Sequence, residues 1–306
     1  MTPDVFFAVL LAALLHAGWN ALIKTRLDRF LSISLLSFGM GAISLVCLPF
    51  VDVPQGSTWI WIILSAALHT GYKLFLIRAY SAGDLGQVYP LARGTAPLMT
   101  ATGGVFLLGE VPSALMGASI LVMCAGITLM SLRGGSGLAG LNRAAVGNAL
   151  ATSLFIAAYT LTDGIGGRST PPAPSYTVWL FLIDGLWVGL FGVGVPGGGG
   201  LYAMLPEWKA GLLTGGLSLG AYWIVIWAMT KAPIGAVAAL RETSILFAIA
   251  IAAFFLKERL SAWRIAAAAL ILAGVAGLRL GQPNVLPKRL RSSPLCPLPL
   301  ALRGDS

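Results

Sequence analysis

Long apolar segments separated by short polar stretches dominate the pattern of hydrophobic and polar positions along this chain. A helix of about 20 apolar residues crosses a bilayer core about 30 Å thick. The sequence lacks the shorter segments of alternating apolar and polar residues that are typical of outer-membrane barrels. The pattern predicts an all-α polytopic membrane protein with ten transmembrane helices: residues 5–24, 30–50, 58–80, 85–108, 114–132, 145–163, 176–196, 208–230, 234–256 and 261–280.

Two blocks of the sequence resemble each other at a separation of about 148 residues. Arg93-Gly94-Thr95 recurs as Arg241-Glu242-Thr243, and in both copies a glutamate, Glu110 or Glu258, lies seventeen residues after the arginine. Internal duplication in an apolar chain is typical of transporters whose binding site lies between the repeats. Each copy holds five predicted spans. Because five is odd, the second copy enters the membrane from the opposite face and forms an inverted repeat.

The duplication and the linkers divide the chain into four parts. We expect a first five-helix repeat at 1–132, a Gly-rich linker at 133–144, a second five-helix repeat at 145–281 and a disordered, basic, Pro-rich tail at 282–306. Residues 164–175 and 196–200 are also predicted to be loops, because clustered glycine and proline interrupt a helix.

Composition indicates a membrane environment. The chain is 57% hydrophobic and 10% charged, whereas a soluble domain is about 25% charged. Much of the net charge of +9 lies in short loops and in the tail, which is typical of membrane topology and not of nucleic-acid binding. The basic loops and the basic tail fall on opposite predicted faces, so the orientation stays open. The three cysteines and two histidines show no metal-ligand spacing, and we expect no cofactor.

Polar side chains inside the predicted spans indicate a binding site, since a charge at the bilayer centre costs at least ~2.5–3.5 kcal/mol on insertion scales. Several recur four residues apart and share a helix face, as His69 does with Lys73. Leu121 and Ile271 are expected to face lipid. We predict that the polar faces surround one central cavity, with the substrate-binding residues His16, Trp19, Asn20, His69, Lys73, Tyr89, Arg93, Tyr159, Trp223, Trp227 and Arg241.

Other acidic residues have structural interpretations. Asp163 lies near the end of a predicted span, where it either caps that end or takes part in function. Asp184 either lines the cavity or is a structural partner of a buried cation. Glu110 and Glu258 lie near the starts of the helices that follow them, where negative charge is favourable, and this indicates a structural role.

The opening LLHAGWNALIK at residues 14–24 and the R-x-T…E-x-x-S block of each half resemble the EamA-type members of the drug/metabolite transporter superfamily. The resemblance covers essentially all of residues 5–280. It implies a ten-helix carrier for a small molecule, with a cavity lined by spans one, three, four, six, eight and nine. Those spans carry the polar faces described above. Asp184 departs from the resemblance, which places its span at the periphery.

These features predict a secondary transporter in the cell (inner) membrane for a small polar metabolite, working by alternating access. Its partners would be a small-molecule substrate and the lipid bilayer. The sequence holds no ATP-binding motif, so coupling would use an ion gradient or an exchanged solute. His16 and His69 are candidate proton carriers, because imidazole ordinarily titrates near neutral pH. Two alternatives stay open: a membrane-embedded enzyme acting on lipid-linked substrates, and a non-transporting membrane partner subunit.

The charged residues also predict the charge of the substrate. In the spans assigned to the cavity, the cations well inside the membrane are Lys73, Arg93 and Arg241, and the sole carboxylate is Glu242. Consecutive side chains on a helix point about 100° apart, so Glu242 and Arg241 should not both face the centre. Two cations would then lack a partner. We therefore expect an anionic or zwitterionic metabolite held by Arg93 or Arg241 with Lys73.

Overall fold

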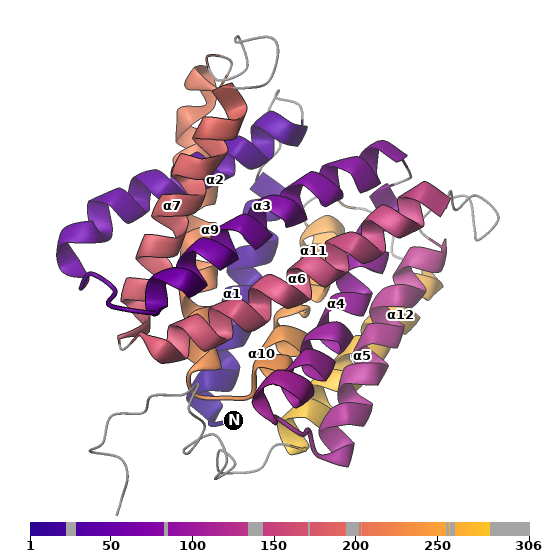
Figure 1. Ribbon diagram of the computed structural model, residues 1–306. Coiled ribbons are helices and arrows are strands. Elements are labelled where there is room, and N and C mark those ends of the chain that lie inside the picture. The colour runs from indigo at the N-terminus through magenta and orange to yellow at the C-terminus, as the bar shows by residue number, and fades with distance from the viewer. Residues whose placement is uncertain are drawn as a thin grey trace, which may run out of the picture.

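The computed structural model describes residues 1–22, 29–82, 85–133, 143–170, 172–193, 202, 204–254, 257 and 261–281. For helical residues 29–30, 80, 85–90, 131–133 and 190–193 it describes the backbone alone. Within these ranges the regular structure is entirely helical (Figure 1).

The helices follow the apolar segments of the sequence closely. They are α1 (Pro3–Leu22), α2 (Arg29–Cys47), α3 (Thr58–Ala82), α4 (Leu85–Leu108), α5 (Ala114–Arg133), α6 (Arg143–Ser169), α7 (Ala173–Val193), α9 (Trp208–Met229), α10 (Ile234–Arg241), α11 (Ser244–Phe254) and α12 (Ala262–Leu280). A 3₁₀ turn, η1 (Leu48–Phe50), follows α2. Another, η3 (Leu205–Glu207), precedes α9.

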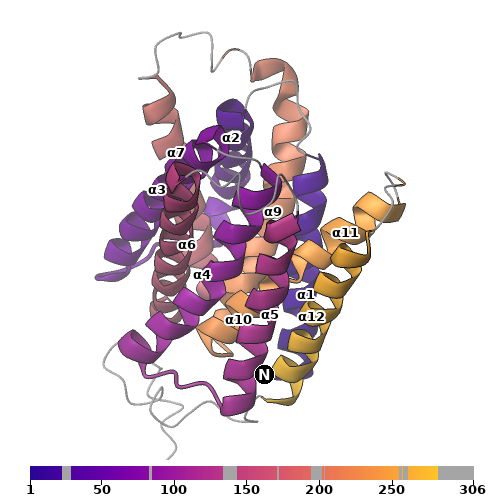
Figure 2. The same ribbon diagram turned by 90° about the vertical axis from the view of Figure 1, so that its right-hand side faces the viewer.

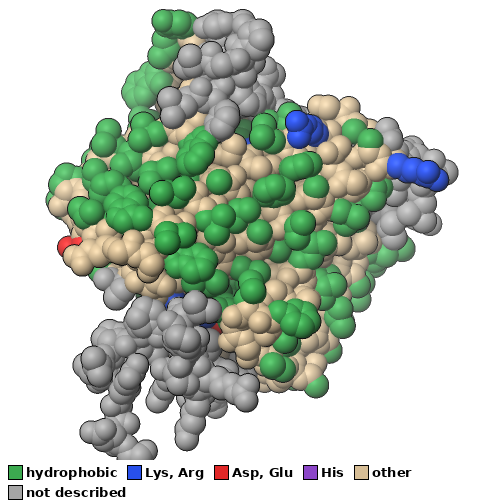
Figure 3. All heavy atoms as spheres, in the orientation of Figure 1, with side chains coloured by type: hydrophobic (Ala, Val, Ile, Leu, Met, Phe, Trp, Pro, Cys, Tyr) green, Lys and Arg blue, Asp and Glu red, His purple; other side chains and the backbone are tan. Residues whose placement is uncertain are grey.

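The helices and their outer surface suit a bilayer. Large hydrophobic side chains such as Phe7, Phe106 and Leu121 are exposed, and Figure 3 shows hydrophobic side chains spread over one face. Helices can face lipid because they satisfy their backbone groups internally. Among the described residues, seven segments are long and apolar enough to cross a membrane: Pro3–Leu22, Leu31–Phe50, Thr58–Ala79, Arg143–Ser169, Leu205–Met229, Ile234–Phe254 and Ala262–Leu280. The described residues are thus helical throughout their regular structure, and their apolar segments indicate an integral membrane protein.

Helices up to α5 pack against helices from α6 onward. α6 packs against α3 and α4, α12 lies along α5, and α9 contacts both α1 and α2 (Figures 1 and 2). α2 approaches α9 so closely that a Cβ atom on Gly39 would collide with the backbone of Gly211. Small residues permit such close approach in membrane helices. The two parts of the chain thus share one extensive interface, and polar side chains meet within it.

The predicted loop at 164–175 is wrong at both ends, because α6 continues to Ser169 and α7 begins at Ala173. Glycine in this stretch serves packing rather than a turn: a Cβ atom on Gly164 would collide with the side chain of Ile234. As a result, Asp163 lies inside α6 and not at the end of a span.

The predicted ninth span consists of two helices, since α10 ends at Arg241 and α11 begins at Ser244. Between them the amide of Glu242 donates to the carbonyl of Ala239 at 3.0 Å, and the amide of Thr243 donates to the carbonyl three residues before it. This tighter 3₁₀-type pattern interrupts the run of α-helical hydrogen bonds between α10 and α11. The expectation that Arg241 and Glu242 point apart stays a prediction, and the Glu242 carboxylate comes within 3.8 Å of the Arg241 guanidinium, between Oε1 and Nη2.

Candidate functional site

One cluster of polar side chains joins α1, α4 and the break between α10 and α11. The Nε atom of Arg93 lies 2.9 Å from Oε2 of Glu242, and both side chains are almost fully buried. A second guanidinium nitrogen, Nη2, lies 3.3 Å from Nε2 of His16. On the other edge of that imidazole, Trp19 Nε1 donates to Nδ1 at 3.3 Å, while the side-chain amide of Asn20 donates to the His16 carbonyl. Four predicted site residues therefore meet at one point.

A second cluster surrounds Asp163 of α6, whose side chain is completely buried. Its carboxylate accepts hydrogen bonds from the hydroxyls of Ser65, Tyr176 and Tyr222, and the last two are 3.0 and 2.9 Å long. The Nε2 atom of His69 lies 3.3 Å away. Helices α3, α6, α7 and α9 each supply a group. Two further predicted residues belong here, since the Tyr159 ring stacks on His69 at 4.0 Å.

Lys73 has a carboxylate partner that the sequence-based charge count lacked. Its ammonium lies 2.6 Å from Oδ2 of Asp184 and donates to Ser37 Oγ at 2.8 Å. The count was wrong because Asp184, on the span expected at the periphery, points at α3. Asp163 was also left out of the count. The cations of the interior are consequently better matched than the sequence indicated.

Arg241 lies between the first two clusters. Its Nη2 atom is 3.8 Å from Oε1 of Glu242, and its guanidinium carbon is 5.8 Å from the centre of the Tyr222 ring. The distance to the ring is in the range of a cation–π contact. Among the described residues, no group is within hydrogen-bonding geometry of the buried Nε atom.

A further ion pair lies at the end of the bundle where α6 and α9 finish. Arg168 Nη1 is 2.7 Å from Oε1 of Glu110, whose other oxygen accepts the amide of Ile234 at 2.8 Å. The same guanidinium donates to the carbonyls of Met229 and Ala232. The structural role predicted for Glu110 agrees with these contacts, although the helix start that it caps is that of α10. Glu258 lies outside the described residues.

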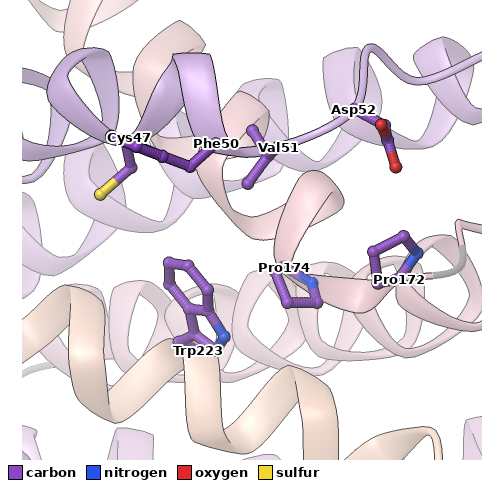
Figure 4. Close-up of a pocket in the computed structure, with 7 residues that line it drawn as sticks. All are labelled: Cys47, Phe50, Val51, Asp52, Pro172, Pro174 and Trp223. Carbon is purple, nitrogen blue, oxygen red and sulfur yellow. The ribbon is translucent and has the colours of Figure 1, made fainter.

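Not every predicted site residue reaches these clusters. Trp223 instead lines a cavity of about 330 Å³ beside η1 and the start of α7. Figure 4 shows its ring pointing toward Val51, with Asp52 at the other side of the cavity. Trp227 packs against an apolar core. The side chain of Tyr89 lies outside the described part of the chain. The cavity is lined by Cys47, Phe50, Val51, Asp52, Pro172, Pro174 and Trp223.

Several contributors to these contacts were not predicted as substrate-binding residues: Ser37, Ser65, Asp163, Tyr176, Asp184, Tyr222 and Glu242. Asp163 carried a usable signal, because it lies four residues after Tyr159 on one face of the same helix. Tyr222 precedes Trp223 directly, and only the packing of α9 determines which of the two aromatic side chains faces the interior.

The sequence model of the EamA-like transporter family matches residues 5–132 and again residues 143–280. The chain belongs to the EamA-like transporter family. It is accordingly a membrane protein of a transporter family, and the two matched regions contain all the clusters described above.

A solved structure has a fold similar to that of this chain. One crystal structure superposes with a TM-score of 0.70 over 92% of this chain and 98% of its own length, at 18% sequence identity. At that identity the likeness concerns the fold alone. No curated protein matches the chain in sequence.

Proposed function

We propose that this EamA-family protein is a secondary transporter that moves a small polar metabolite across the cell (inner) membrane by alternating access, and that it has no enzymatic activity. One observation carries the proposal. Three buried polar contacts each join the first matched region to the second: Arg93–Glu242, His69–Asp163 and Lys73–Asp184. Buried ionisable groups are expensive in a membrane and generally mark a transport path. Contacts across an interface between two halves can break and form again as the halves rock.

The architecture that we propose is two inverted five-helix repeats, at residues 1–132 and 145–281, with a linker at 133–144 and a tail at 282–306. In this description α10 and α11 together make one interrupted ninth span, giving ten spans. Helix pairing supports the description: α1 packs against α9, and the helices at the corresponding positions, α6 and α3, also pack together. Interrupted helices near the substrate are a recurrent feature of transporters.

For the substrate we propose an anionic or zwitterionic metabolite, moved with a proton or against an exchanged solute. Arg241 supports the negative charge, because it is a buried cation at a longer distance from Glu242 than Arg93 is. His16 and His69 are the candidate proton carriers, and each lies in a cluster that joins the two matched regions.

Flux through sealed proteoliposomes tests the proposal. Purified protein would be reconstituted, loaded with pooled unlabelled metabolites and assayed for uptake of labelled ones, with and without an imposed pH gradient. Protein-free vesicles from the same lipid serve as the control. Uptake above that control is expected for at least one polar metabolite. Flux equal to the control for every solute would favour the enzyme or the partner subunit instead.

A further inference from the structure

The two arginines around Glu242 do not share its carboxylate equally. Arg93 forms a close ion pair with Glu242, with 2.9 Å between Nε and Oε2, whereas Arg241 Nη2 lies 3.8 Å from Oε1. Both guanidinium groups are buried, each with 4% of the residue exposed. The negative charge of Glu242 therefore neutralises mainly Arg93. The positive charge of Arg241 is less well balanced.

The remaining buried carboxylates are committed to other groups. Asp184 binds Lys73, and Glu110 binds Arg168 at the end of the bundle. Asp163 accepts a hydrogen bond from the Tyr222 hydroxyl, and the ring of that tyrosine lies beside the guanidinium of Arg241. The Tyr222 side chain thus contacts both the carboxylate of Asp163 and the guanidinium of Arg241.

The Arg241 guanidinium has one edge that carries Nε and Nη2. These two nitrogens are coplanar hydrogen-bond donors. Nε is buried and has no hydrogen-bond partner among the described residues, and Nη2 is too far from Glu242 to donate to it. A buried donor without an acceptor is costly. Such an edge fits the two oxygens of a carboxylate, which accept two parallel hydrogen bonds from arginine.

We infer that the Nε–Nη2 edge of Arg241 binds a carboxylate group of the transported solute, with the Tyr222 ring beside it. This inference rests on the proposed function and narrows it. Arg93 and Lys73 are not the groups that hold the substrate, because each already binds a carboxylate of the protein. The negative charge of Glu242, close to Nη2, favours a singly charged carboxylate over a doubly charged phosphate.

Thermal unfolding of the full-length protein in detergent tests this. The probes are acetate, benzoate and phenylacetate, each beside its neutral amide, with inorganic phosphate and tetraphenylphosphonium for comparison. Binding to the folded state raises the melting temperature. We expect at least one carboxylate to stabilise the wild type, its amide to have no effect, and Arg241→Lys to weaken the apparent affinity by about tenfold or more, since the paired donors are lost.

Arg168→Lys is the matched control, because it alters a buried, ion-paired arginine outside the proposed site. It should lower stability yet keep the carboxylate-induced shift. Glu242→Gln keeps the test decisive if the Arg241 variant does not fold: removing the negative neighbour should tighten carboxylate binding. Stabilisation by phosphate or the phosphonium alone, by no carboxylate, or equally in Arg241→Lys would overturn the inference, as would weaker binding to Glu242→Gln.

Flux measurements separate this inference from the proposed function. If proteoliposomes carry a neutral or cationic solute and Arg241→Lys leaves that flux intact, the protein is a transporter and the assignment of Arg241 is wrong. If no solute moves, the transporter proposal itself fails.

Discussion

Asp184 on α7 forms an ion pair with Lys73 on α3, with 2.6 Å between Oδ2 and Nζ. The ammonium also donates to Ser37 on α2, so a single cation joins three helices. The Asp184 side chain is 2% exposed and that of Lys73 is 14% exposed. When one member of such a pair is removed, the other charge stays buried without a partner, which costs more than the loss of both.

Asp184→Asn is therefore expected to lower the free energy of unfolding by about 3–5 kcal/mol. The double variant Lys73→Met with Asp184→Leu should lie closer to the wild type, because it buries no unpaired charge. Reversible unfolding in detergent, analysed as a double-mutant cycle, measures the coupling. A double variant less stable than both single variants would contradict this account.

Asp163→Asn should damage the cluster that joins α3, α6, α7 and α9. The asparagine oxygen can replace only one side of the carboxylate, and its NH₂ group would face the hydroxyls of Tyr176 or Tyr222, which now donate to Asp163. An unsatisfied buried group costs about 1–3 kcal/mol. We expect a lower melting temperature and loss of flux.

Tyr222→Phe is the milder comparison for the Asp163 cluster. It removes one donor but keeps the aromatic ring beside Arg241. Its melting temperature should fall less than that of Asp163→Asn. If both variants unfolded at the wild-type temperature, the Asp163 hydrogen bonds would contribute nothing to stability.

Two Glu110 variants should distinguish the contribution of its ion pair with Arg168 from that of its hydrogen bond with the Ile234 amide. Glu110→Gln loses the ion pair with Arg168 but keeps an acceptor for the amide of Ile234, whereas Glu110→Ala loses both. We expect the alanine variant to be less stable than the glutamine variant by about 1 kcal/mol. Hydrogen exchange at the Ile234 amide gives a local measurement: exchange should be fast in Glu110→Ala and slow in Glu110→Gln. Equal exchange would contradict the capping role.

The helices were largely predictable because a bilayer constrains them strongly. Each must be apolar and about 20 residues long, so hydropathy locates it; α5, for example, was expected at 114–132 and is observed at Ala114–Arg133. The boundary of α6 was not predictable in this way. Its glycines contact Ile234 and other side chains of neighbouring helices, and the sequence alone does not distinguish glycine in a helix contact from glycine in a turn.

The polar partners were harder to predict than the polar residues. His16, His69 and Arg93 lie in buried clusters as polar residues inside spans should, but their pairing depends on contacts between distant helices. The link between Lys73 and Asp184 spans 111 residues of sequence. No spacing rule along one helix reports such a contact, so the charge count changed once the helices were placed.

Cysteine labelling should distinguish the cavity beside η1 from the lipid-facing surface. In a variant with Cys47, Cys124 and Cys296 replaced by serine, Trp223→Cys is expected to react with a water-soluble thiol reagent. Its side chain lines the cavity of about 330 Å³, and the carboxylate of Asp52, which is exposed, lies on the same cavity. Leu121→Cys should not react, because Leu121 is 55% exposed on an apolar helix surface that lipid covers.

The choice of control matters for this experiment. Ile271, expected from the sequence to face lipid, is completely buried, so its lack of reaction would be uninformative. Leu272 is 57% exposed and is the better second control. The native Cys47 lines the same cavity as Trp223 and gives an internal check, since restoring it alone should restore labelling. Equal labelling of Trp223→Cys, Leu121→Cys and Leu272→Cys would show that water does not enter the cavity selectively, and the cavity would then have no part in admitting a polar solute.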